Sequence, residues 1–292
     1  MSARLEFGLS ITPTWLKLPE VLRLAQVADE TGLDLVGIQD HPYQWRFYDT
    51  WTLIAYLAGR TSRVRFFPDV ASLPLRPPAI LAKAAASLDV LSGGRLELGL
   101  GAGAFWDAIV AMGGPRRSPR QAVEAIEEAI DVIRLVWSGE RGVRYEGRHY
   151  QLSGLHTGPK PAHDIGIWVG AGGPRMLDLI GRKADGWVPS ASWAPPEALP
   201  RYLRRIDDAT RKAGRDLASI RRVYNLMGAI QPATGGRLVG PTAFWVGELL
   251  RLVDMGMDAF IFWPGGEDPL GQAEAFATEV VPAVRAGIGG RG

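Results

Sequence analysis

Short apolar segments typical of buried strands alternate with longer segments of helical periodicity along most of this 292-residue chain, and this alternation limits the possible folds more than any other feature. Several helical segments begin at a proline or end at a glycine, the residues that suit those positions. Strands are predicted at Leu5–Ile11, Leu35–Ile38, Val64–Val70, Leu96–Leu100, Ile165–Val169, Gly186–Val188, Val223–Ile230 and Ala259–Phe262. Helices are predicted at Pro19–Thr31, Thr50–Gly59, Pro78–Leu91, Pro119–Trp137, Pro174–Lys183, Pro195–Ala213, Phe244–Met255 and Ala273–Val284.

Eight strand and helix units in succession predict an α/β fold, a single-domain (β/α)8 barrel of the TIM type over residues 1–292. A doubly wound open sheet is the rival architecture, but no point at which the strand order would reverse is visible. The segment Ser138–His163 breaks the rhythm with glycines among polar residues. We expect it to form a hairpin-like excursion over the barrel.

The composition limits the cellular compartment in which such a barrel is expected and the kinds of partner that it can bind. Hydrophobic residues make up 47% of the chain and charged residues 22%, which is ordinary for a globular protein. The formal net charge of +2 and scattered basic residues speak against nucleic acid as a partner. No apolar run approaches the ~18 residues of a membrane helix, and no secretory signal pattern precedes the first strand. Because cysteine is absent, disulfides and thiolate sites are excluded, and we expect a cytoplasmic protein.

The residues that follow the predicted strands indicate where the chemistry lies. Asp40-His41 follows the second strand, and Asp69 comes near the end of the third. Glycine-rich loops, Gly99–Gly103 and Gly170–Gly173, follow the fourth and the fifth. Because the carboxyl ends of barrel strands meet on one face, these groups should line one pocket with exposed backbone amides.

The loop after the fifth predicted strand is the strongest candidate for an anion site. Gly170, Ala171, Gly172 and Gly173 let a ligand approach the backbone, and Pro174 suits the first position of the next helix. Free amides and the helix dipole there favour a phosphate or a carboxylate, although a plain strand-to-helix turn is the alternative. The spacing in Gly99–Gly103 is G-x-G-x-G, which departs from the dinucleotide fingerprint and excludes a Rossmann site.

Other patterns in the chain point to weaker alternatives. His41 titrates in the range of a general acid or base, but it could equally shape its loop by a hydrogen bond to Asp40. Asp40 and Asp69 could serve glycoside hydrolysis, although the glycine loops would then lack a purpose. The three loop histidines His149, His156 and His163 recur every seven residues, yet no carboxylate stands at ligand spacing and we expect no metal site.

Tryptophans gather near the predicted strand ends. They are Trp45, Trp51, Trp106, Trp187, Trp193 and Trp263. Core packing explains some of them, and an aromatic mouth that receives a planar ring explains more.

These motifs resemble those of the luciferase-like flavin-dependent oxidoreductases over nearly the whole chain. Within that superfamily they look most like the branch that uses the deazaflavin coenzyme F420, with methylenetetrahydromethanopterin reductase and F420-dependent glucose-6-phosphate dehydrogenase. The residues that carry the resemblance are Asp40-His41 with Trp45, the segment 79–95 (AILAKAAASLDVLSGGR), Gly99–Gly103 and Gly170–Met176.

The resemblance implies roles for particular residues. Those expected to lie along the coenzyme are Asp40, Asp69, Val70, Ala71, Gly103, Ala104, Asp107, Gly170, Ala171, Gly172, Gly173 and Pro174. A non-proline cis peptide is implied between Asp69 and Val70, bulging against the ring. His41 and Trp45 match the catalytic residues that lie over the reacting carbon.

Two departures from the sugar-phosphate dehydrogenases bear on the substrate. Ala104 stands where those enzymes carry an acidic residue, and Trp187–Pro196 contains no basic residue to grip a sugar phosphate. The sequence therefore favours a less charged substrate than glucose 6-phosphate.

We expect an enzyme that transfers a hydride between coenzyme F420 and a small organic substrate. An FMN-dependent monooxygenase using reduced flavin and oxygen is the first alternative, and a non-catalytic flavin-binding barrel is the second. The resemblance also implies a homodimer or a higher homo-oligomer.

Overall fold

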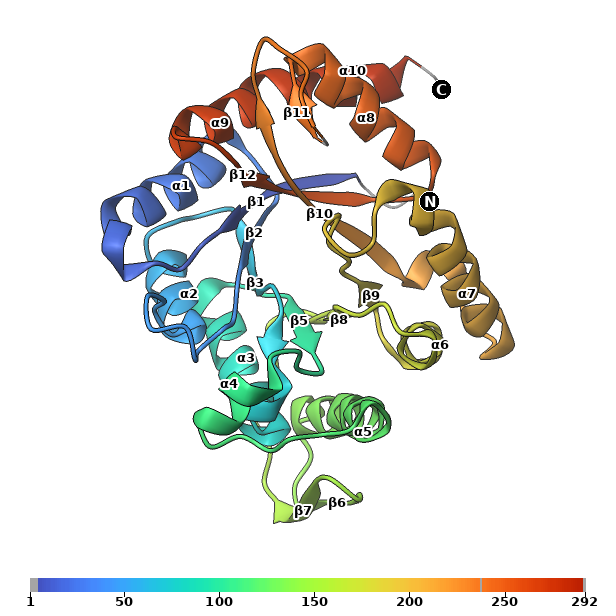
Figure 1. Cartoon of the computed structure of the whole chain (residues 1–292). Coiled ribbons are helices and arrows are strands. Elements are labelled where there is room, and N and C mark those ends of the chain that lie inside the picture. Colours follow the sequence, from blue (N-terminus) through green and yellow to red (C-terminus); the bar gives the residue numbers. More distant parts are fainter. Residues whose placement is uncertain (1–4, 237, 291–292) are drawn as a thin grey trace.

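Parallel strands form a nearly closed barrel with helices around it (Figure 1) in the computed structural model, which describes residues 5–236 and 238–290. The barrel strands are β1 (Glu6–Ile11), β2 (Leu35–Ile38), β3 (Arg65–Pro68), β4 (Ala71–Ser72), β5 (Leu98–Gly101), β8 (Ile167–Val169), β9 (Gly186–Trp187), β10 (Arg221–Ile230) and β12 (Ala259–Pro264). Neighbours run in the order β3-β2-β1-β12-β10-β9-β8-β5-β4, and a parallel bridge between Phe66 and Leu96 brings β3 beside the start of β5. The predicted α/β barrel is confirmed.

The third barrel strand, predicted over Val64–Val70 with an interruption at Pro68, is divided into two parts. It consists of β3, which pairs with β2 up to Pro68, and β4, which begins at Ala71 and pairs with β5. Between them the Asp69–Val70 peptide is cis, as the resemblance implied. The strand thus changes partner at this break, and the break lies at the carboxyl end of the barrel.

The helices cover the outside of the barrel in Figure 1. They are α1 (Leu18–Thr31), α2 (Thr50–Ala58), α3 (Pro78–Ser92), α4 (Trp106–Ala111), α5 (Pro119–Trp137), α6 (Pro174–Lys183), α7 (Leu199–Lys212), α8 (Thr242–Asp254), α9 (Pro269–Ala275) and α10 (Val281–Gly289), with a π-helical turn at Phe276–Val280. Short 3-10 turns lie at Trp15–Lys17, Leu73–Leu75, Pro196–Ala198 and Leu217–Ser219. The helix predicted over Ala273–Val284 therefore consists of three segments. Within the described ranges, no helix combines the length and hydrophobicity needed to cross a bilayer.

Local sequence explains the best-defined helix, α5. Ser118 accepts a hydrogen bond from the Gln121 amide, and the Gln121 side chain accepts one from the Ser118 amide, which makes a capping box. Pro119 occupies the first helical position, where its missing N–H costs nothing. Ile126, Ile130 and six further residues of α5 are buried, so an apolar stripe fixes the helix against the barrel.

The excursion over Ser138–His163 forms the predicted hairpin, but in a different place. Its strands β6 (Val143–Glu146) and β7 (Gln151–Leu155) pair antiparallel. The Glu128 carboxylate of α5 accepts hydrogen bonds from the amides of Arg148, His149 and Tyr150. The hairpin therefore packs on the outer side of α5 (Figure 1) rather than over the barrel.

Candidate active site

Two adjoining cavities open at the carboxyl ends of the barrel strands. The first, here called the glycine lobe, has a volume of about 250 Å³ and is lined by Asp40, His41, Tyr43, Val70, Ser72, Gly101, Ala102, Gly103, Ala104, Gly170 and Ala171. The second, the polar lobe, has a volume of about 310 Å³ and is lined by Ser10, Gln39, Asp69, Val70, Ala104, Gly170, Ala171, Gly172, Val188, Ser190, Trp193, Asn225 and Trp263. Four residues are common to both lists, so the lobes are neighbouring parts of one cleft.

Val70 forms the wall between the two lobes. Its side chain lies over glycines of the neighbouring strand and loop, where added Cβ atoms would meet the Val70 methyl groups at 2.7 Å from Gly101 and 3.0 Å from Gly170. Real Cβ atoms essentially never approach so closely, so glycine is required at Gly101 as long as Val70 keeps this position. The break in the third strand thus lifts one branched side chain into the middle of the cleft.

Asp40 is buried and held by an arginine at the edge of the glycine lobe. The Asp40 carboxylate accepts hydrogen bonds from Arg76 Nε at 2.6 Å and Nη2 at 2.7 Å, and from the Ser72 amide at 2.9 Å. Arg76 also pairs with Asp49 at 2.6 Å, and these two carboxylates raise the pKa of the guanidinium against the opposing effect of its burial. The Arg76 guanidinium neutralises the Asp40 carboxylate, and the carboxylate in turn holds the backbone amide of Ser72. Asp40 therefore shapes the site through its neighbours.

His41 contacts two aromatic residues in the glycine lobe. Its Nδ1 lies 2.7 Å from the Tyr43 hydroxyl, and its ring meets Phe105 edge-on with centroids 5.6 Å apart. Burial lowers the pKa of His41, although the nearby Asp40 charge works in the opposite direction. Burial also raises the pKa of Tyr43 to about 12. At neutral pH the imidazole is therefore uncharged and the phenol protonated, which is a pair suited to holding or moving one proton.

The loop before α6 presents backbone amides to the cleft. Among the described residues, the amides of Ala171, Gly172 and Gly173 have no hydrogen-bond acceptor, and they lie at the amino end of a ten-residue helix. A Cβ on Gly172 would come within 2.7 Å of the Trp193 ring, so any larger residue would have to displace the indole or the loop. This arrangement suits a phosphate or a carboxylate, as predicted for the loop.

A carboxylate and an amide lie together in the polar lobe. Asn225 Nδ2 donates to Asp69 Oδ1 at 3.0 Å, and this pair joins positions 156 residues apart in the sequence. Desolvation raises the pKa of Asp69 to about 6, since the single hydrogen bond from Asn225 offsets it only in part. The pair is the most unusual polar feature inside the barrel.

The cleft contains most of the coenzyme residues expected from the sequence, but some lie elsewhere. Trp45 is 68% exposed and packs on Trp15, and the Asp107 side chain is 97% exposed and pairs with Arg116. Ala71 is buried within β4. Gly173 and Pro174 are exposed at the start of α6. None of these five lines either lobe.

Sequence reasoning missed several lining residues. Tyr43 is two residues from His41, so its place in the motif could have drawn attention to it. Ser10, Gln39 and Asn225 carry no local pattern, because the barrel alone brings them together. The expected aromatic mouth is reduced to Trp193 and Trp263, since Trp187 is fully buried in the core and Trp51 nearly so.

The loop histidines of the excursion have separate partners. His149 pairs with Glu124 at 3.4 Å, and His163 with Asp89 at 2.9 Å. Within the ranges that the structure describes, no group of three potential metal ligands is found.

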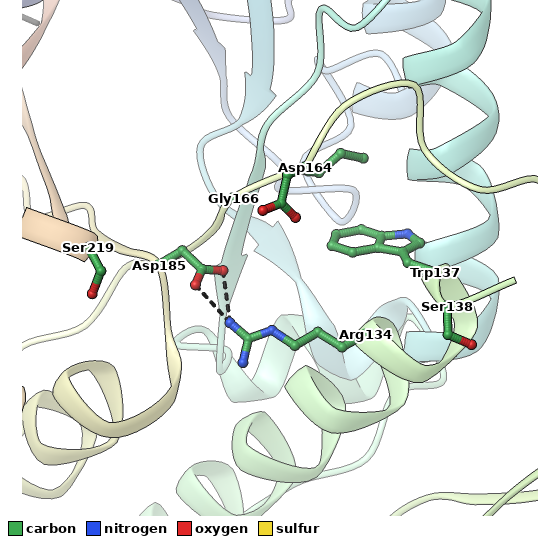
Figure 2. Close-up of a pocket in the computed structure, with 8 residues that line it drawn as sticks. Arg134, Trp137, Ser138, Asp164, Gly166, Asp185 and Ser219 are labelled. Atoms are coloured by element: carbon green, nitrogen blue, oxygen red, sulfur yellow. Dashed lines mark hydrogen bonds and ion pairs between the residues drawn. The ribbon is translucent and has the colours of Figure 1, made fainter. Parts of the chain in front are cut away.

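A larger cavity of about 560 Å³ lies at the opposite end of the barrel (Figure 2). Residues just before β8, β9 and β10 line it, together with Arg134 and Trp137 from the end of α5. Arg134 donates to both oxygens of Asp185, at 2.8 and 2.9 Å. Because barrel enzymes place their chemistry at the carboxyl ends of the strands, we assign the active site to the two-lobed cleft.

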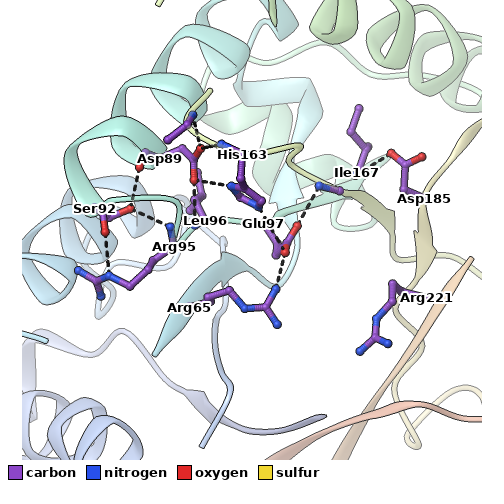
Figure 3. A network of polar contacts seen from close by, with 12 residues as sticks. Arg65, Asp89, Ser92, Arg95, Leu96, Glu97, His163, Ile167, Asp185 and Arg221 are labelled. Carbon is purple, nitrogen blue, oxygen red and sulfur yellow. Dashed lines mark hydrogen bonds and ion pairs between the residues drawn. The ribbon is translucent and has the colours of Figure 1, made fainter. Parts of the chain in front are cut away.

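The same amino-terminal end holds a chain of ion pairs (Figure 3). Arg65 bonds Glu97 at 2.5 Å and also pairs with Glu6, whose second oxygen lies 2.6 Å from Arg221. His163 joins this chain through Glu97, 3.7 Å away. Charged residues at the starts of four barrel strands, and His163 in the loop before β8, are thereby paired within the molecule.

Comparisons with known proteins identify the family of the chain. The family model for luciferase-like monooxygenase matches residues 5–232. An F420-dependent glucose-6-phosphate dehydrogenase of Nakamurella multipartita is 28% identical over 254 residues, covering 85% of this chain and 74% of the relative. The enzyme of the same name from Microbacterium testaceum is 30% identical over 222 residues, covering 74% of this chain and 65% of the relative.

Two solved structures show the same fold. An F420-dependent secondary alcohol dehydrogenase in complex with an F420-acetone adduct superposes with a TM-score of 0.87, at 19% identity over 97% of this chain and 99% of that one. The coenzyme F420-dependent tetrahydromethanopterin reductase of Methanopyrus kandleri gives 0.83, at 22% identity over 96% of this chain and 99% of that one. Since the family model covers most of the chain, the protein belongs to the luciferase-like monooxygenase family, as the resemblance in its sequence predicted.

Proposed function

We propose that the protein is an oxidoreductase that transfers a hydride between coenzyme F420 and a small organic substrate. The observation that carries the proposal is the position of Val70, lifted by the break in the third strand into a cleft floored by glycines. A flat ring can approach the backbone closely only where side chains are absent, and it needs a firm support behind it. The side chains are absent at Gly101, Gly103 and Gly170, and Val70 provides the support.

The residues present fit the coenzyme in two further ways. Among the described residues, the amides of Ala171, Gly172 and Gly173 have no acceptor and suit its phosphate, and the small side chains of Ser72 and Ala102 line the glycine lobe. The relatives that share most of this chain are named for F420, which supports the same choice. When bound, a deazaflavin accepts or gives a hydride at its central ring.

His41 would handle the proton that accompanies the hydride. In the tautomer whose Nδ1–H donates to the Tyr43 hydroxyl, Nε2 carries the lone pair and would accept a substrate hydroxyl proton. Burial keeps the pKa of the ring below its usual value, so the accepting form dominates at neutral pH. In the reverse direction the same nitrogen returns the proton. Phe105 packs edge-on against the ring and limits its orientation.

Parallel titrations with F420 and FMN test the proposed coenzyme. We expect F420 to bind at least about tenfold more tightly than FMN, with the difference read from fluorescence quenching of each coenzyme. Tighter binding of FMN, together with oxygen consumption in the presence of reduced FMN, would contradict the proposal and indicate a monooxygenase. In a turnover assay for alcohol oxidation, kcat/KM should rise with pH through a pKa below about 6.5, the usual value of histidine.

We also propose that the protein forms a homodimer or a higher homo-oligomer. Ile80 and Leu91 of α3 are 70% and 84% exposed, which is unusual for large apolar side chains on one helix. Light scattering on the purified chain measures the oligomeric state directly, and a monomeric mass at all concentrations would contradict this proposal.

A further inference from the structure

A single arginine holds both ends of the loop that carries His41. Asp40 comes two residues after β2, and Asp49 is the residue that caps the start of α2. Arg76 donates to Asp40 through Nε and Nη2, and the same Nη2 lies 2.6 Å from an oxygen of Asp49. Arg76 itself ends the 3-10 turn that follows β4. It therefore ties the His41 loop to the segment that follows the break in the third strand.

The Asp40 carboxylate depends on this arginine for compensation of its charge. The Asp40 side chain is 0% exposed and the Arg76 side chain 18%. Within the part of the chain that the structure describes, the only other donor to this carboxylate is the Ser72 amide. A buried carboxylate that lacks a cation resists ionisation and also draws a proton to any base beside it. Arg76 counteracts both effects.

His41 is the base beside this carboxylate. Burial lowers the pKa of His41, and the charge of Asp40 opposes that shift. In the lining of the glycine lobe, Asp40 and Tyr43 are the only other ionisable residues. At the start of α4, His41 contacts the uncharged ring of Phe105, and the Asp107 side chain beyond it is 97% exposed and paired with an arginine. The protonation state of His41 therefore depends on its burial and on how far Asp40 is compensated.

We infer that Arg76 is a positioning residue of the active site, which fixes both ends of the His41 loop and, by compensating Asp40, keeps His41 in its uncharged, proton-accepting form. This inference rests on the proposed function only for the role of His41 in turnover. The contacts of Arg76 belong to the folded chain without coenzyme. A lysine at this position would keep the charge, but its single ammonium group lacks the planar array of donors that reaches both carboxylates.

Substitutions at Arg76 and Asp40 test the coupling to His41. Arg76→Met removes the cation, so the titration midpoint of His41 should move upward by about one pH unit or more. In the double variant Asp40→Asn/Arg76→Met the carboxylate charge is lost as well, and the midpoint should return to the parent value or slightly below it. Asparagine keeps an oxygen that can accept from the Ser72 amide, so the shape of the site is retained.

Nitrogen NMR of the histidine rings measures these midpoints in the full chain without coenzyme. The chain has four histidines, and the spectrum of His41→Gln identifies the signal of His41. Arg65→Met is the matched control, because Arg65 also joins two carboxylates, Glu6 and Glu97, at the opposite end of the barrel. The control should leave the midpoint of His41 unchanged, and thermal melting verifies that each variant is folded.

Arg76→Lys separates the charge of the arginine from its geometry. The midpoint of His41 should stay near the parent value, while kcat/KM for alcohol oxidation should fall by about tenfold or more because one end of the loop is released. In Arg76→Met the acid limb of the kcat/KM profile should move upward together with the NMR midpoint. These two results distinguish an electrostatic role of Arg76 from a purely structural one.

An unchanged midpoint of His41 in folded Arg76→Met would overturn the inference, and so would a raised midpoint that persists in the double variant. If Arg76→Met does not fold, the comparison of Asp40→Asn with the double variant decides. Loss of the arginine charge should raise the midpoint of His41 in that background too, and equal midpoints would overturn the inference. Absence of F420-dependent turnover would contradict the proposed function alone, because the NMR titration needs no coenzyme.

Discussion

The amino and carboxyl ends of this barrel contain similar polar residues arranged in opposite ways. At the amino end, Asp89 is fully buried and accepts hydrogen bonds from the amides of Leu96, Ala162 and His163 and from the His163 ring. At the carboxyl end, Asp69 has one donor, Asn225, and faces a cavity. At the first end, the Asp89 carboxylate is fully hydrogen-bonded and stabilises the fold. The second leaves acceptors and amides unsatisfied, which costs stability and creates a place for ligands.

The largest expected effect is a loss of stability caused by a substitution at the amino end of the barrel. Asp89→Ala removes the acceptor of four hydrogen bonds and leaves buried donors unpaired, so the free energy of unfolding should fall by about 3–5 kcal/mol. Urea denaturation followed by circular dichroism measures the loss. Coenzyme affinity of the folded fraction should stay unchanged, and a parallel loss of affinity would show that the two ends are not independent.

The second largest effect is expected on turnover, from a substitution at the carboxyl end of the barrel. His41→Ala removes the proposed proton carrier and should lower turnover by about 10²-fold or more, with coenzyme affinity altered less than about threefold. Steady-state kinetics and the F420 titration provide the two values. Equal losses in both would mean that His41 shapes the loop instead of handling a proton.

A smaller change tests the amide loop. Gly172→Val places a side chain against the Trp193 ring, and we expect coenzyme affinity to weaken by more than about tenfold as the loop moves away from the phosphate. Gly247→Ala is the matched control, because a Cβ there meets no atom within 4 Å. Affinity equal to that of the parent chain would reject the loop as the anion site.

The smallest effect is a pH dependence at the amino end of the barrel. Glu97, and with it Asp89, raises the pKa of His163 above the usual value, although partial burial acts in the opposite direction. A raised pKa in the folded state adds stability that is full below the unfolded value of about 6.5 and is lost as pH rises through the folded pKa. The unfolding free energy should therefore drop by less than about 1 kcal/mol on going from slightly acidic to slightly alkaline pH. The part due to this residue should vanish in His163→Gln, and an identical slope in that variant would exclude His163 as the cause.

The sequence predicted the architecture well because periodicity and capping are local signals. The predicted helix over Pro119–Trp137 coincides with α5, where a capping box, a proline and an apolar stripe agree. The interruption of the third strand was expected from Pro68 and from the resemblance, but the pairing of β4 with β5 was not, because it depends on contacts between distant segments. The glycine loops were located from their place after apolar strands. The hairpin was predicted correctly. Its position against α5 was not predicted, because it depends on hydrogen bonds to Glu128.

The site was predicted only as far as motifs extend. Asp40, His41 and Gly172 belong to recognisable strings of residues, and each lines the cleft. Asn225 lies far from Asp69 in the sequence, and no spacing rule links them. Trp187 ends β9 and Trp263 lies near the end of β12, yet Trp187 is fully buried in the core, because strand-end position alone does not decide which face a side chain occupies.

Val70 belongs to both lobes, and this shared position has an evolutionary consequence. A larger residue there would tighten the fit of one occupant and crowd the other, and a smaller one would loosen both at once. Residues that line one lobe alone, such as Tyr43 in the glycine lobe and Trp263 in the polar lobe, can change with an effect on a single occupant. A change of preference is therefore easier at these positions than at Val70.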